Sequence, residues 1–595
     1  MIEQKINKIN SYLIKHIIFL QFIFAILIFV GNSILLGINY SKEIQEIVLK
    51  LIKTIGLSNN YRIQEWFINF FLRLSIRYNL IYTILFLFFD AFFLFVIFRN
   101  KIEQSEKMKN VVCITTGIFS ALFVALILDN GNGWGGDFSE YIAQSRAIVT
   151  RTIKEQVENN TYIINNSGPM LGDAVYPWGF PFLLSPFFAI FGKNLFALKI
   201  PVLICFSISV IFCNLIFRKH FSFFQAELMT LFIAINPNFI YFCNSPLSDI
   251  PFLSFSMISI YFIEKLFYET KNTLQNSILV GVFSFCAFMT RSIGIIFPCL
   301  LFSLHILTAF SKNPKINYKI VNFGFINFPK IDLPTHFLSY FIFVILYILQ
   351  KSILPQAGNT YIQDLNLVNL KSILVQIKYY SLIFKDFFPC FQSILYSWLI
   401  LFFAYGFIRY FFKYPVFSIY ILGVMGMLIL WPAQQGIRFC FPVFPIIMIF
   451  TAFGIRDFIK SFSNKKILYM LISFELCILI LFSALFIQRS LFHSNEYGAY
   501  SKDAKELYSY VKKNIKENEK IIFFKPRVLY LETGRLGFRT SDIGRLSEVD
   551  YLLLSKDGYG TFDYDIEEQY PKESKNLDKV FENESLKMYK VNLQK

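Results

Sequence analysis

The sequence has little charge for its length and no cysteine or histidine pattern typical of a metal site. Charged residues make up 16% of the 595 residues, 55% are hydrophobic and 19% aromatic, and the mean hydropathy is +0.51. This composition lies outside the range of soluble globular domains. The nine cysteines include no CxxC pair, and Cys113, Cys205, Cys213 and Cys477 lie within apolar runs. We therefore expect neither a disulfide framework nor a zinc site.

Motifs for soluble cosubstrates and for common hydrolases are also missing. No P-loop, HExxH or Ser-His-Asp signature is evident, so neither ATP nor a soluble nucleotide sugar is implied. The formal net charge is +17, but the basic residues form short clusters between apolar runs instead of a continuous patch. We interpret these clusters as determinants of membrane topology, and we expect no nucleic-acid partner.

Long apolar runs are what the sequence does have. Most run to about 17–23 residues, the length that a helix needs to cross a hydrocarbon core of roughly 30 Å. They predict about 13 transmembrane helices: 15–37, 79–98, 110–128, 197–217, 224–243, 251–268, 276–289, 292–309, 334–355, 391–411, 415–431, 438–455 and 466–487.

Basic clusters between these runs suggest an orientation. With the amino terminus inside, clusters such as Arg99/Lys101/Lys107/Lys109 and Arg456/Lys460/Lys465/Lys466 become cytoplasmic. The loop 38–78, basic yet external in this scheme, has apolar residues at helical spacing that suggest an interfacial helix. We predict a multi-pass protein of a prokaryotic cytoplasmic (inner) membrane, with the carboxyl-terminal domain outside.

Three segments are expected to be external and structured. They are loop 129–196, loop 356–390 with an amphipathic stretch near 370–387, and the tail 488–595. In the tail, Asp503 to Lys516 has a helical pattern, whereas 521–524, 528–530 and 551–554 have strand patterns, so a small extracytoplasmic α/β domain is predicted. The expected organisation is an amino-terminal region 1–109, a transmembrane module 110–487 and this carboxyl-terminal domain.

Two acidic helix starts are candidate site elements. Asp137, Glu140, Tyr141 and Gln144 share one face of a helix that follows the glycine-rich segment 131–136. Asp137 and Glu140 also have the spacing of a capping box, which would account for them structurally. Asp249, before Pro251, is favoured as a helix cap but faces the same compartment in this scheme.

Two arginines stand at the predicted external ends of helices, where basic residues are usually scarce. Arg291 lies in Thr-Arg-Ser and Arg438 in Gly-Ile-Arg-Phe. Either guanidinium can be a snorkelling anchor, or it can grip a phosphate through paired charge-assisted hydrogen bonds. Lys525-Pro526-Arg527, in the tail, is interpreted as solvated surface more readily than as a basic rim.

Five motifs in sequence order resemble the GT-C membrane glycosyltransferases, in particular the family of lipid A aminoarabinose transferases and protein O-mannosyltransferases. They are GDFSEY at 136–141, YPWGFP at 176–181, SDIPF at 248–252, TRSIG at 290–294 and RFCFPVFP at 438–445. The resemblance covers about 110–455, and the two extra amino-terminal spans lie outside it.

The resemblance implies a donor in which a monosaccharide is linked to polyprenyl phosphate, an extracytoplasmic acceptor and inversion at the anomeric carbon. It maps the catalytic carboxylate of the family onto Asp137. The family often places a second acid directly beside the first, whereas Glu140 stands three residues away. Arg291 and Arg438 are then expected to stabilise the departing lipid phosphate, while Tyr141, Tyr176, Trp178 and Asp249 are candidates for the substrate cavity; packing is the more frequent use of such aromatic residues.

Other functions fit parts of the pattern. A lipid-linked sugar transporter or flippase also needs many spans, although the chain shows no internal duplication. An oligosaccharide ligase or polymerase would use a polyprenyl-diphosphate donor. No cofactor is required by the sequence, and a divalent metal stays open, because two acids three residues apart do not make a site.

Overall fold

The computed structural model describes residues 105–125, 128–167, 172–269, 271–311, 333–355, 368–388, 392–431, 433–460, 496–558 and 560–592. The predicted spans 15–37, 79–98 and 466–487 and the interfacial helix in 38–78 lie outside these residues.

Among the described residues, six helices are long and apolar enough to cross a membrane, or seven if one bent pair counts as a span. The six are α4 (Glu106–Ala125), α8 (Leu195–Phe217), α11 (Asp249–Tyr268), α12 (Thr273–Thr290), η1 with the start of α13 (Ser292–Ala309) and α14 (Leu333–Ile353). The chain is therefore an integral multi-pass membrane protein. Thirteen crossings stay a prediction.

The bent pair covers the run that we predicted as one span at 224–243. It consists of α9 (Phe223–Ala234) and α10 (Pro237–Cys243), which meet at 52°. Pro237 stands in the first turn of α10 and lacks a backbone N–H, so it ends one helix and begins the next. Asn236 caps the second helix by accepting a hydrogen bond from the Asn238 amide at 3.1 Å.

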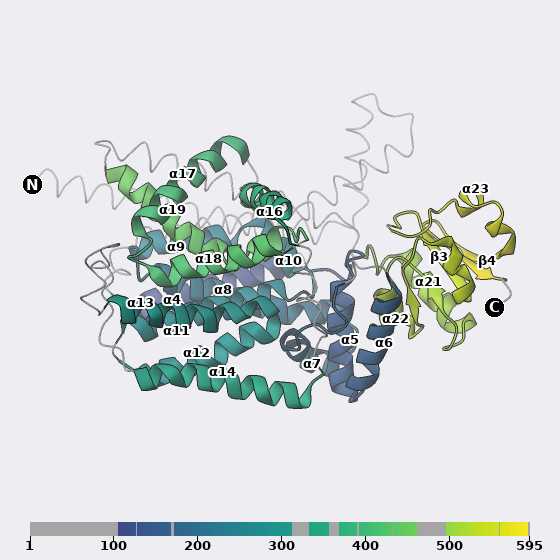
Figure 1. Cartoon of the computed structure of the whole chain (residues 1–595), viewed down its shortest axis with the longest axis horizontal. Helices are drawn as coiled ribbons and strands as arrows, with labels where there is room; N and C mark the ends of the chain where they lie inside the picture. Colours follow the sequence, from purple (N-terminus) through teal and green to yellow (C-terminus); the bar gives the residue numbers. More distant parts are fainter. Residues whose placement is uncertain are drawn as a thin grey trace, which may run out of the picture. The chain divides into compact units, whose positions relative to one another are not determined.

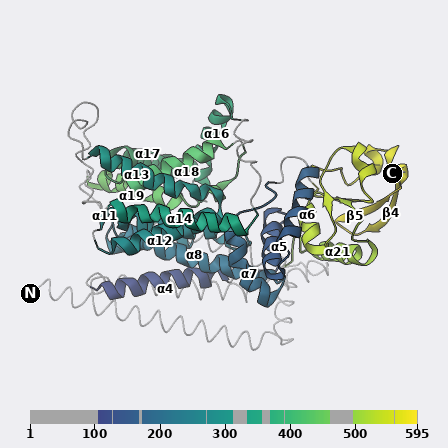
Figure 2. The same cartoon turned by 60° about the horizontal axis from the view of Figure 1, so that its bottom comes forward.

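The central helices lie side by side, each packed against the next. Helix α8 packs against α11, α11 against α12, and α12 against α14 (Figures 1 and 2). Helices α17 (Gln392–Tyr410) and α19 (Phe444–Lys460) form another closely packed pair, and α18 (Pro415–Leu430) packs against α13 (Ile296–Ser311). Gly406 and Gly454 lie in the α17–α19 contact, where a Cβ on either would collide with the opposite backbone, so small residues permit this close approach.

The segment between α4 and α8 forms three helices, which confirms that it is more than a connector. They are α5 (Asp137–Thr150), α6 (Ile153–Asn166) and α7 (Gly179–Phe191). Helix α5 packs against α6 and α7. The amphipathic stretch near 370–387 is also helical, as α16 (Leu370–Ile383) and η3 (Phe384–Phe387), with Leu370 and Leu374 exposed on its surface.

The carboxyl-terminal domain contains a five-stranded mixed sheet of order β2-β1-β3-β5-β4. Its elements are α21 (Lys502–Asn514), β1 (Ile521–Ile522), α22 (Pro526–Thr533), β2 (Gly537–Phe538), η5 (Ile543–Glu548), β3 (Tyr551–Ser555), α23 (Ile566–Gln569), η6 (Glu573–Asn576), β4 (Leu577–Glu582) and β5 (Leu586–Val591). Strand β1 is parallel to β2 and β3, while β5 is antiparallel to β3 and β4.

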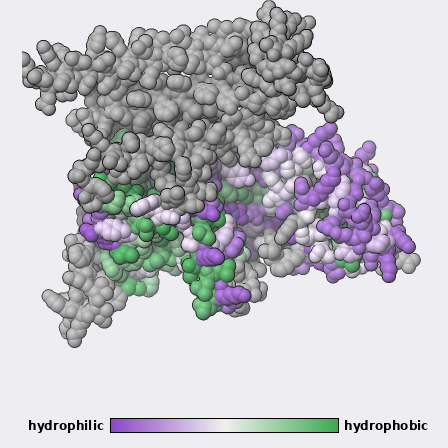
Figure 3. Space-filling model, turned by 90° about the horizontal axis from the view of Figure 1, so that it is seen from above, coloured by the Kyte–Doolittle hydropathy of each residue, from purple (hydrophilic) through white to green (hydrophobic). Residues whose placement is uncertain are grey.

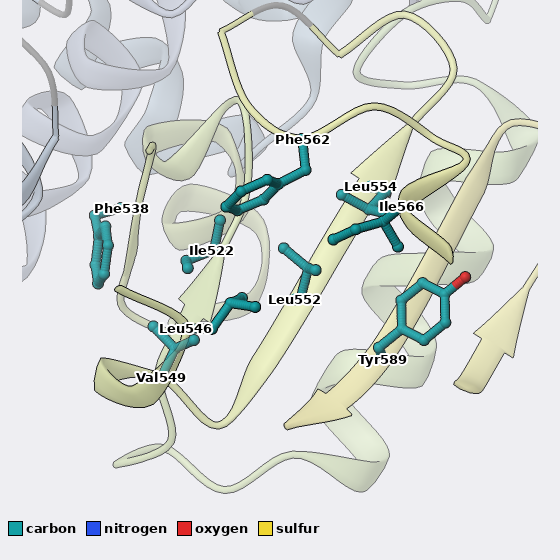
Figure 4. Close-up of a cluster of buried hydrophobic side chains, with 9 residues drawn as sticks. All are labelled: Ile522, Phe538, Leu546, Val549, Leu552, Leu554, Phe562, Ile566 and Tyr589. Carbon is teal, nitrogen blue, oxygen red and sulfur yellow. The ribbon is translucent and has the colours of Figure 1, made fainter. Parts of the chain in front are cut away.

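One row of paired residues carries the core of this sheet. Ile522 is in register with Phe538 on one side and Leu552 on the other, and Leu552 is in register with Tyr589. Side chains in register share a face of the sheet, and these four belong to a buried cluster with Leu546, Val549, Leu554, Phe562 and Ile566 (Figure 4). Hydrophilic side chains prevail on the surface of this domain and hydrophobic ones on the helical part (Figure 3).

Most of the tail prediction is confirmed, with one correction. The helix from Asp503, the strand at 521–522 and the strand from Tyr551 are all present. Residues 528–530, predicted as a strand, lie in helix α22. Pro526 in its first turn and Gly534 after its end, in the left-handed region at φ 75°, are the helix boundaries that outweigh the short apolar run.

Candidate active site

Asp137 begins helix α5 but does not cap it. The cap position is Gly136, and no side-chain cap bond is made there. Instead, Asp137 Oδ1 accepts a hydrogen bond from the Tyr176 hydroxyl at 2.9 Å, and Oδ2 accepts one from Arg438 Nη2 at 2.9 Å. The capping-box interpretation of Asp137 and Glu140 is therefore wrong, because the carboxylate is used in contacts from distant parts of the chain.

These contacts set the charge state of Asp137. Burial raises the pKa of its carboxyl, but the charge of Arg438, the hydrogen bonds from Tyr176 and Arg438 and the charge of Arg527 together outweigh burial and hold the pKa below its usual range. The side chain keeps 35% of its surface exposed. Asp137 is thus an ionised carboxylate that a ligand can reach.

Asp249 occupies the equivalent place at the start of α11 and is 2% exposed. Its Oδ1 accepts a short hydrogen bond from Arg291 Nη1, and its Oδ2 lies 3.8 Å from Arg438 Nη1. The cap position is Ser248, again without a side-chain cap bond. The favoured interpretation of Asp249 as a helix cap is wrong, because a buried carboxylate takes a cation as partner where one is in reach.

Both arginines lie where a helix is interrupted. Arg291 has extended backbone between α12 and η1, and Arg438 lies in η4 (Ile437–Cys440) after Gly436. Gly436 has φ 78° and ψ 179°, a conformation open essentially to glycine alone. Both guanidiniums lie over the ring of Phe439, at 3.9 Å for Arg291 and 5.3 Å for Arg438. The structure thus brings together Asp137, the expected base, with Arg291 and Arg438, the expected phosphate partners, and places the cavity candidate Asp249 between the two arginines.

Glu140 is not part of this ion-pair network. Its side chain is buried, and its carboxylate accepts a hydrogen bond from Gln156 Nε2, on α6, at 3.4 Å. Burial raises the pKa of Glu140 to about 7, despite opposing effects from Arg527 and Gln156. Glu140 thus contacts α6, and among the described residues it forms no ion pair with the two arginines that were predicted to bind phosphate.

The aromatic candidates separate into two groups. The Tyr141 and Tyr176 rings pack with their centroids 5.0 Å apart beside Asp137, and the Tyr141 hydroxyl bonds to Ser248 Oγ at 2.8 Å. Gln144 fixes the Tyr176 backbone from α5 by donating to its carbonyl at 3.0 Å. Trp178, in contrast, is 1% exposed in a cluster with Met289 and Leu354, so its contacts are those of a packing residue.

Arg527 lies beside the site, although its sequence context predicts an exposed residue. It was interpreted as solvated surface, but its side chain is 3% exposed and donates to the Tyr176 hydroxyl at 2.9 Å and to Asn160 Oδ1 at 2.9 Å. The correction has a physical reason: helix α22 packs directly against α5, which buries that face of the domain. A basic tripeptide gives no signal of this burial.

A second buried cation braces the segment that leads to Asp137. Lys199, within the apolar run at 197–217, is fully buried and donates from Nζ to Asp129 Oδ1, Gly131 O and Asn244 Oδ1, each at 2.8 Å. It lies at the start of α8, so it ties the glycine-rich segment to the helix bundle. A lone lysine in an apolar run indicates that the folded protein provides a buried polar partner for its ammonium group.

Among the described residues, no group of three or more His, Cys, Asp or Glu side chains is placed to hold a metal ion. The two carboxylates of the ion-pair network, Asp137 and Asp249, are bound to guanidiniums.

Three comparisons with known proteins bear on this site. Residues 176–330 match the family model described as dolichyl-phosphate-mannose-protein mannosyltransferase. No curated protein matches the sequence. The matched residues include three of the five motifs in full, at 176–181, 248–252 and 290–294, and with them Asp249 and Arg291.

Solved structures show the fold. The chain is similar to ArnT from Cupriavidus metallidurans bound to undecaprenyl phosphate, with TM-score 0.55, 10% identity and coverage of 82% of this chain and 99% of that one. The apo form of the same protein gives TM-score 0.52 with equal identity and coverage. The alignment with the archaeal oligosaccharyltransferase AglB from Archaeoglobus fulgidus, in complex with an inhibitory peptide and a dolichol-phosphate, covers 74% of this chain and 69% of that one at 12% identity, with a TM-score of 0.45. The predicted resemblance to GT-C glycosyltransferases is confirmed.

Proposed function

We propose that the chain is a membrane glycosyltransferase of the mannosyltransferase and ArnT type, which uses a polyprenyl-phosphate sugar. It transfers one monosaccharide to an extracytoplasmic acceptor with inversion, with Asp137 as the base. The observation that carries the proposal is the ion-pair network of Asp137, Arg438, Asp249 and Arg291. It places an ionised carboxylate beside cations suited to a phosphate.

The charges of the network favour an anionic donor. Arg291 and Arg438 balance the charges of Asp137 and Asp249. Arg527, bonded to the Tyr176 hydroxyl next to Asp137, adds a third guanidinium and so an excess of positive charge. Guanidiniums bind phosphate oxygens in pairs, and partial burial strengthens that interaction relative to water. A polyprenyl phosphate would bring its headgroup to Arg438 and Arg291 while its chain stays among the apolar helices.

Donor binding and base strength are then linked through Arg438. A carboxylate with a depressed pKa is ionised but is a weak base. When the donor phosphate binds the Arg438 guanidinium, the phosphate shares this cation with Asp137, and the pKa of Asp137 rises toward the ordinary value. Asp137 accepts the proton of the acceptor hydroxyl as the sugar carbon passes through an oxocarbenium-like state, and Arg438 and Arg291 stabilise the leaving phosphate.

The roles of the other candidates follow from their contacts. Tyr141 and Tyr176 lie beside Asp137 and would face the sugar, whereas Trp178 supports the wall behind them. Asp249 holds Arg291 in place. If the acceptor is a phosphate or carboxylate that is already ionised, Asp137 positions it instead of removing a proton.

The test is transfer by purified protein in detergent or liposomes, supplied with a polyprenyl-monophosphate sugar or, separately, with a diphosphate-linked oligosaccharide. We expect turnover of the first only, and Asp137→Asn should abolish it while protein yield is unchanged. Asp542→Asn, on the surface of the carboxyl-terminal domain, serves as the matched control. Near-normal turnover of D137N would rule out the base, and consumption of the diphosphate donor would favour a ligase or polymerase. A transporter would consume neither.

A further inference from the structure

Arg527 reaches the site from a separate domain. It lies in the first turn of α22, and its three nitrogens donate to three different residues: Nε to Asn160 Oδ1 at 2.9 Å, Nη1 to the Tyr176 hydroxyl at 2.9 Å, and Nη2 to the Asp173 carbonyl at 2.5 Å. An arginine this deeply buried needs such partners, since burial of an unpaired charge is costly. Its planar fork also fixes the direction of each bond.

The direction of the hydrogen bonds determines where the Tyr176 proton points. A guanidinium only donates, so the Tyr176 oxygen accepts from Arg527 Nη1. The single hydroxyl proton of Tyr176 is then directed to Asp137 Oδ1, 2.9 Å away. Arg527, Tyr176 and Asp137 therefore form a chain in which each member donates to the next, and Arg527 is also 5.0 Å from the centroid of the Tyr176 ring.

The same domain also contacts the segment that precedes Asp137. Trp134, in the glycine-rich segment just before Asp137, packs against Phe523 and Phe524, with ring centroids 5.8 Å and 5.0 Å away. The Ala499 amide donates to the Asn132 carbonyl at 3.0 Å. Both the segment that leads into α5 and the tyrosine that bonds to its first residue are thus held by residues beyond 496.

We propose that Arg527 is a positioning residue that directs the Tyr176 hydroxyl to Asp137, so that the carboxyl-terminal domain completes the catalytic site. This inference rests on the proposed role of Asp137 as base. It assigns the domain a function in the reaction in addition to any role in stability.

The experiment compares Arg527→Gln and Tyr176→Phe with a matched control, Arg545→Gln. Arg545 also joins this domain to the helical part, by donating to the Asn166 carbonyl at 2.6 Å, but it does not contact Tyr176 or Asp137. We expect R527Q and Y176F each to lower kcat on the order of tenfold to a hundredfold, the effect of slight misplacement of a reacting group, with a smaller change in KM for the donor. R545Q should retain activity close to that of the unchanged protein.

The pH profile distinguishes a role of Arg527 in positioning the Tyr176 hydroxyl from a role only in holding the carboxyl-terminal domain against the helices. Loss of the Arg527 charge or of the Tyr176 hydrogen bond raises the pKa of Asp137, so the acid limb of kcat/KM should move to higher pH in both variants. In the double variant R527Q/Y176F, the acid limb should move little further than in either single variant. Y176F leaves the Asn160 and Asp173 bonds of Arg527 in place, so it tests the inference even if R527Q folds poorly. An unmoved acid limb in Y176F, or equal loss in R527Q and R545Q, overturns the inference. Full activity of D137N would instead overturn the proposed base, a separate result.

Discussion

Arg438 lies between Asp137 and Asp249: one terminal nitrogen donates to Asp137 at 2.9 Å, and the other is 3.8 Å from Asp249, too far for a hydrogen bond. The guanidinium is therefore tightly bound on one side and loosely paired on the other. A donor phosphate can approach the loosely paired side without first breaking a hydrogen bond to Asp249. This geometry makes Arg438 the most informative residue for donor binding.

Arg438→Lys should keep the positive charge yet lose most transfer. A lysine ammonium cannot bond Asp137 and a phosphate with the paired geometry of a guanidinium, and one well-placed charge is worth on the order of 10² in rate. We expect kcat/KM to fall by about 10²-fold, with a raised KM for the polyprenyl-phosphate sugar. Arg456→Lys, at the far end of α19 beside Tyr410, is the control, and a comparable loss there would show a general effect on folding.

Asp249→Asn should destabilise the protein more than a surface change would. It leaves the Arg291 guanidinium without its carboxylate, and removal of one member of a buried pair costs about 3–5 kcal/mol. Arg291→Gln should cost a similar amount, because it leaves the buried Asp249 side chain without its hydrogen-bonded guanidinium. The double variant should be less destabilised than the sum of the two, measured by thermal unfolding in detergent. Additive losses would show that the two side chains do not act as a pair.

The hydropathy pattern placed Asp137, Arg291 and Arg438 at helix ends on one predicted side of the membrane, and the resemblance to GT-C enzymes implied a shared role for them. The sequence misassigned the local roles of Asp137 and Asp249, since both stand where a helix cap is expected. The local sequence shows the backbone N–H groups that a capping carboxylate would bind. It does not show the distant arginine that binds the carboxylate in the folded protein.

Arg527 was beyond the reach of the same reasoning. Nothing in Lys525-Pro526-Arg527 indicates that the tail packs on α5, because burial between domains depends on tertiary contact. The helix that carries it was predictable in principle from Pro526 at its start and Gly534 after its end, but the apolar residues 528–530 suggested a strand. Whether a short apolar run forms a helix or a strand depends on the residues that flank it and pack against it.

Glu140 should make stability depend on pH in a direction opposite to that of a paired carboxylate. Its pKa is raised from 4.5 to about 7 in the folded protein, so the folded state binds more protons than the unfolded state between these values. The stability that Glu140 contributes is present at low pH and falls as the pH rises from about 4.5 to about 7. Glu140→Gln should remove this slope, measured as the difference in Tm between the two proteins across pH 5–8. Parallel curves would mean that Glu140 is ionised and compensated throughout.

Lys199→Met should weaken both stability and turnover. The substitution keeps the length of the side chain but removes the donor that Asp129, Gly131 and Asn244 share, and loss of a buried charged partner costs about 3–5 kcal/mol. Lys154→Met, at an exposed ion pair with Glu158, is the matched control and should cost about 1 kcal/mol or less. Because Gly131 opens the segment that ends at Asp137, we also expect kcat to fall in K199M protein that remains folded, whereas full activity in that protein would show that the Lys199 contacts do not position the base.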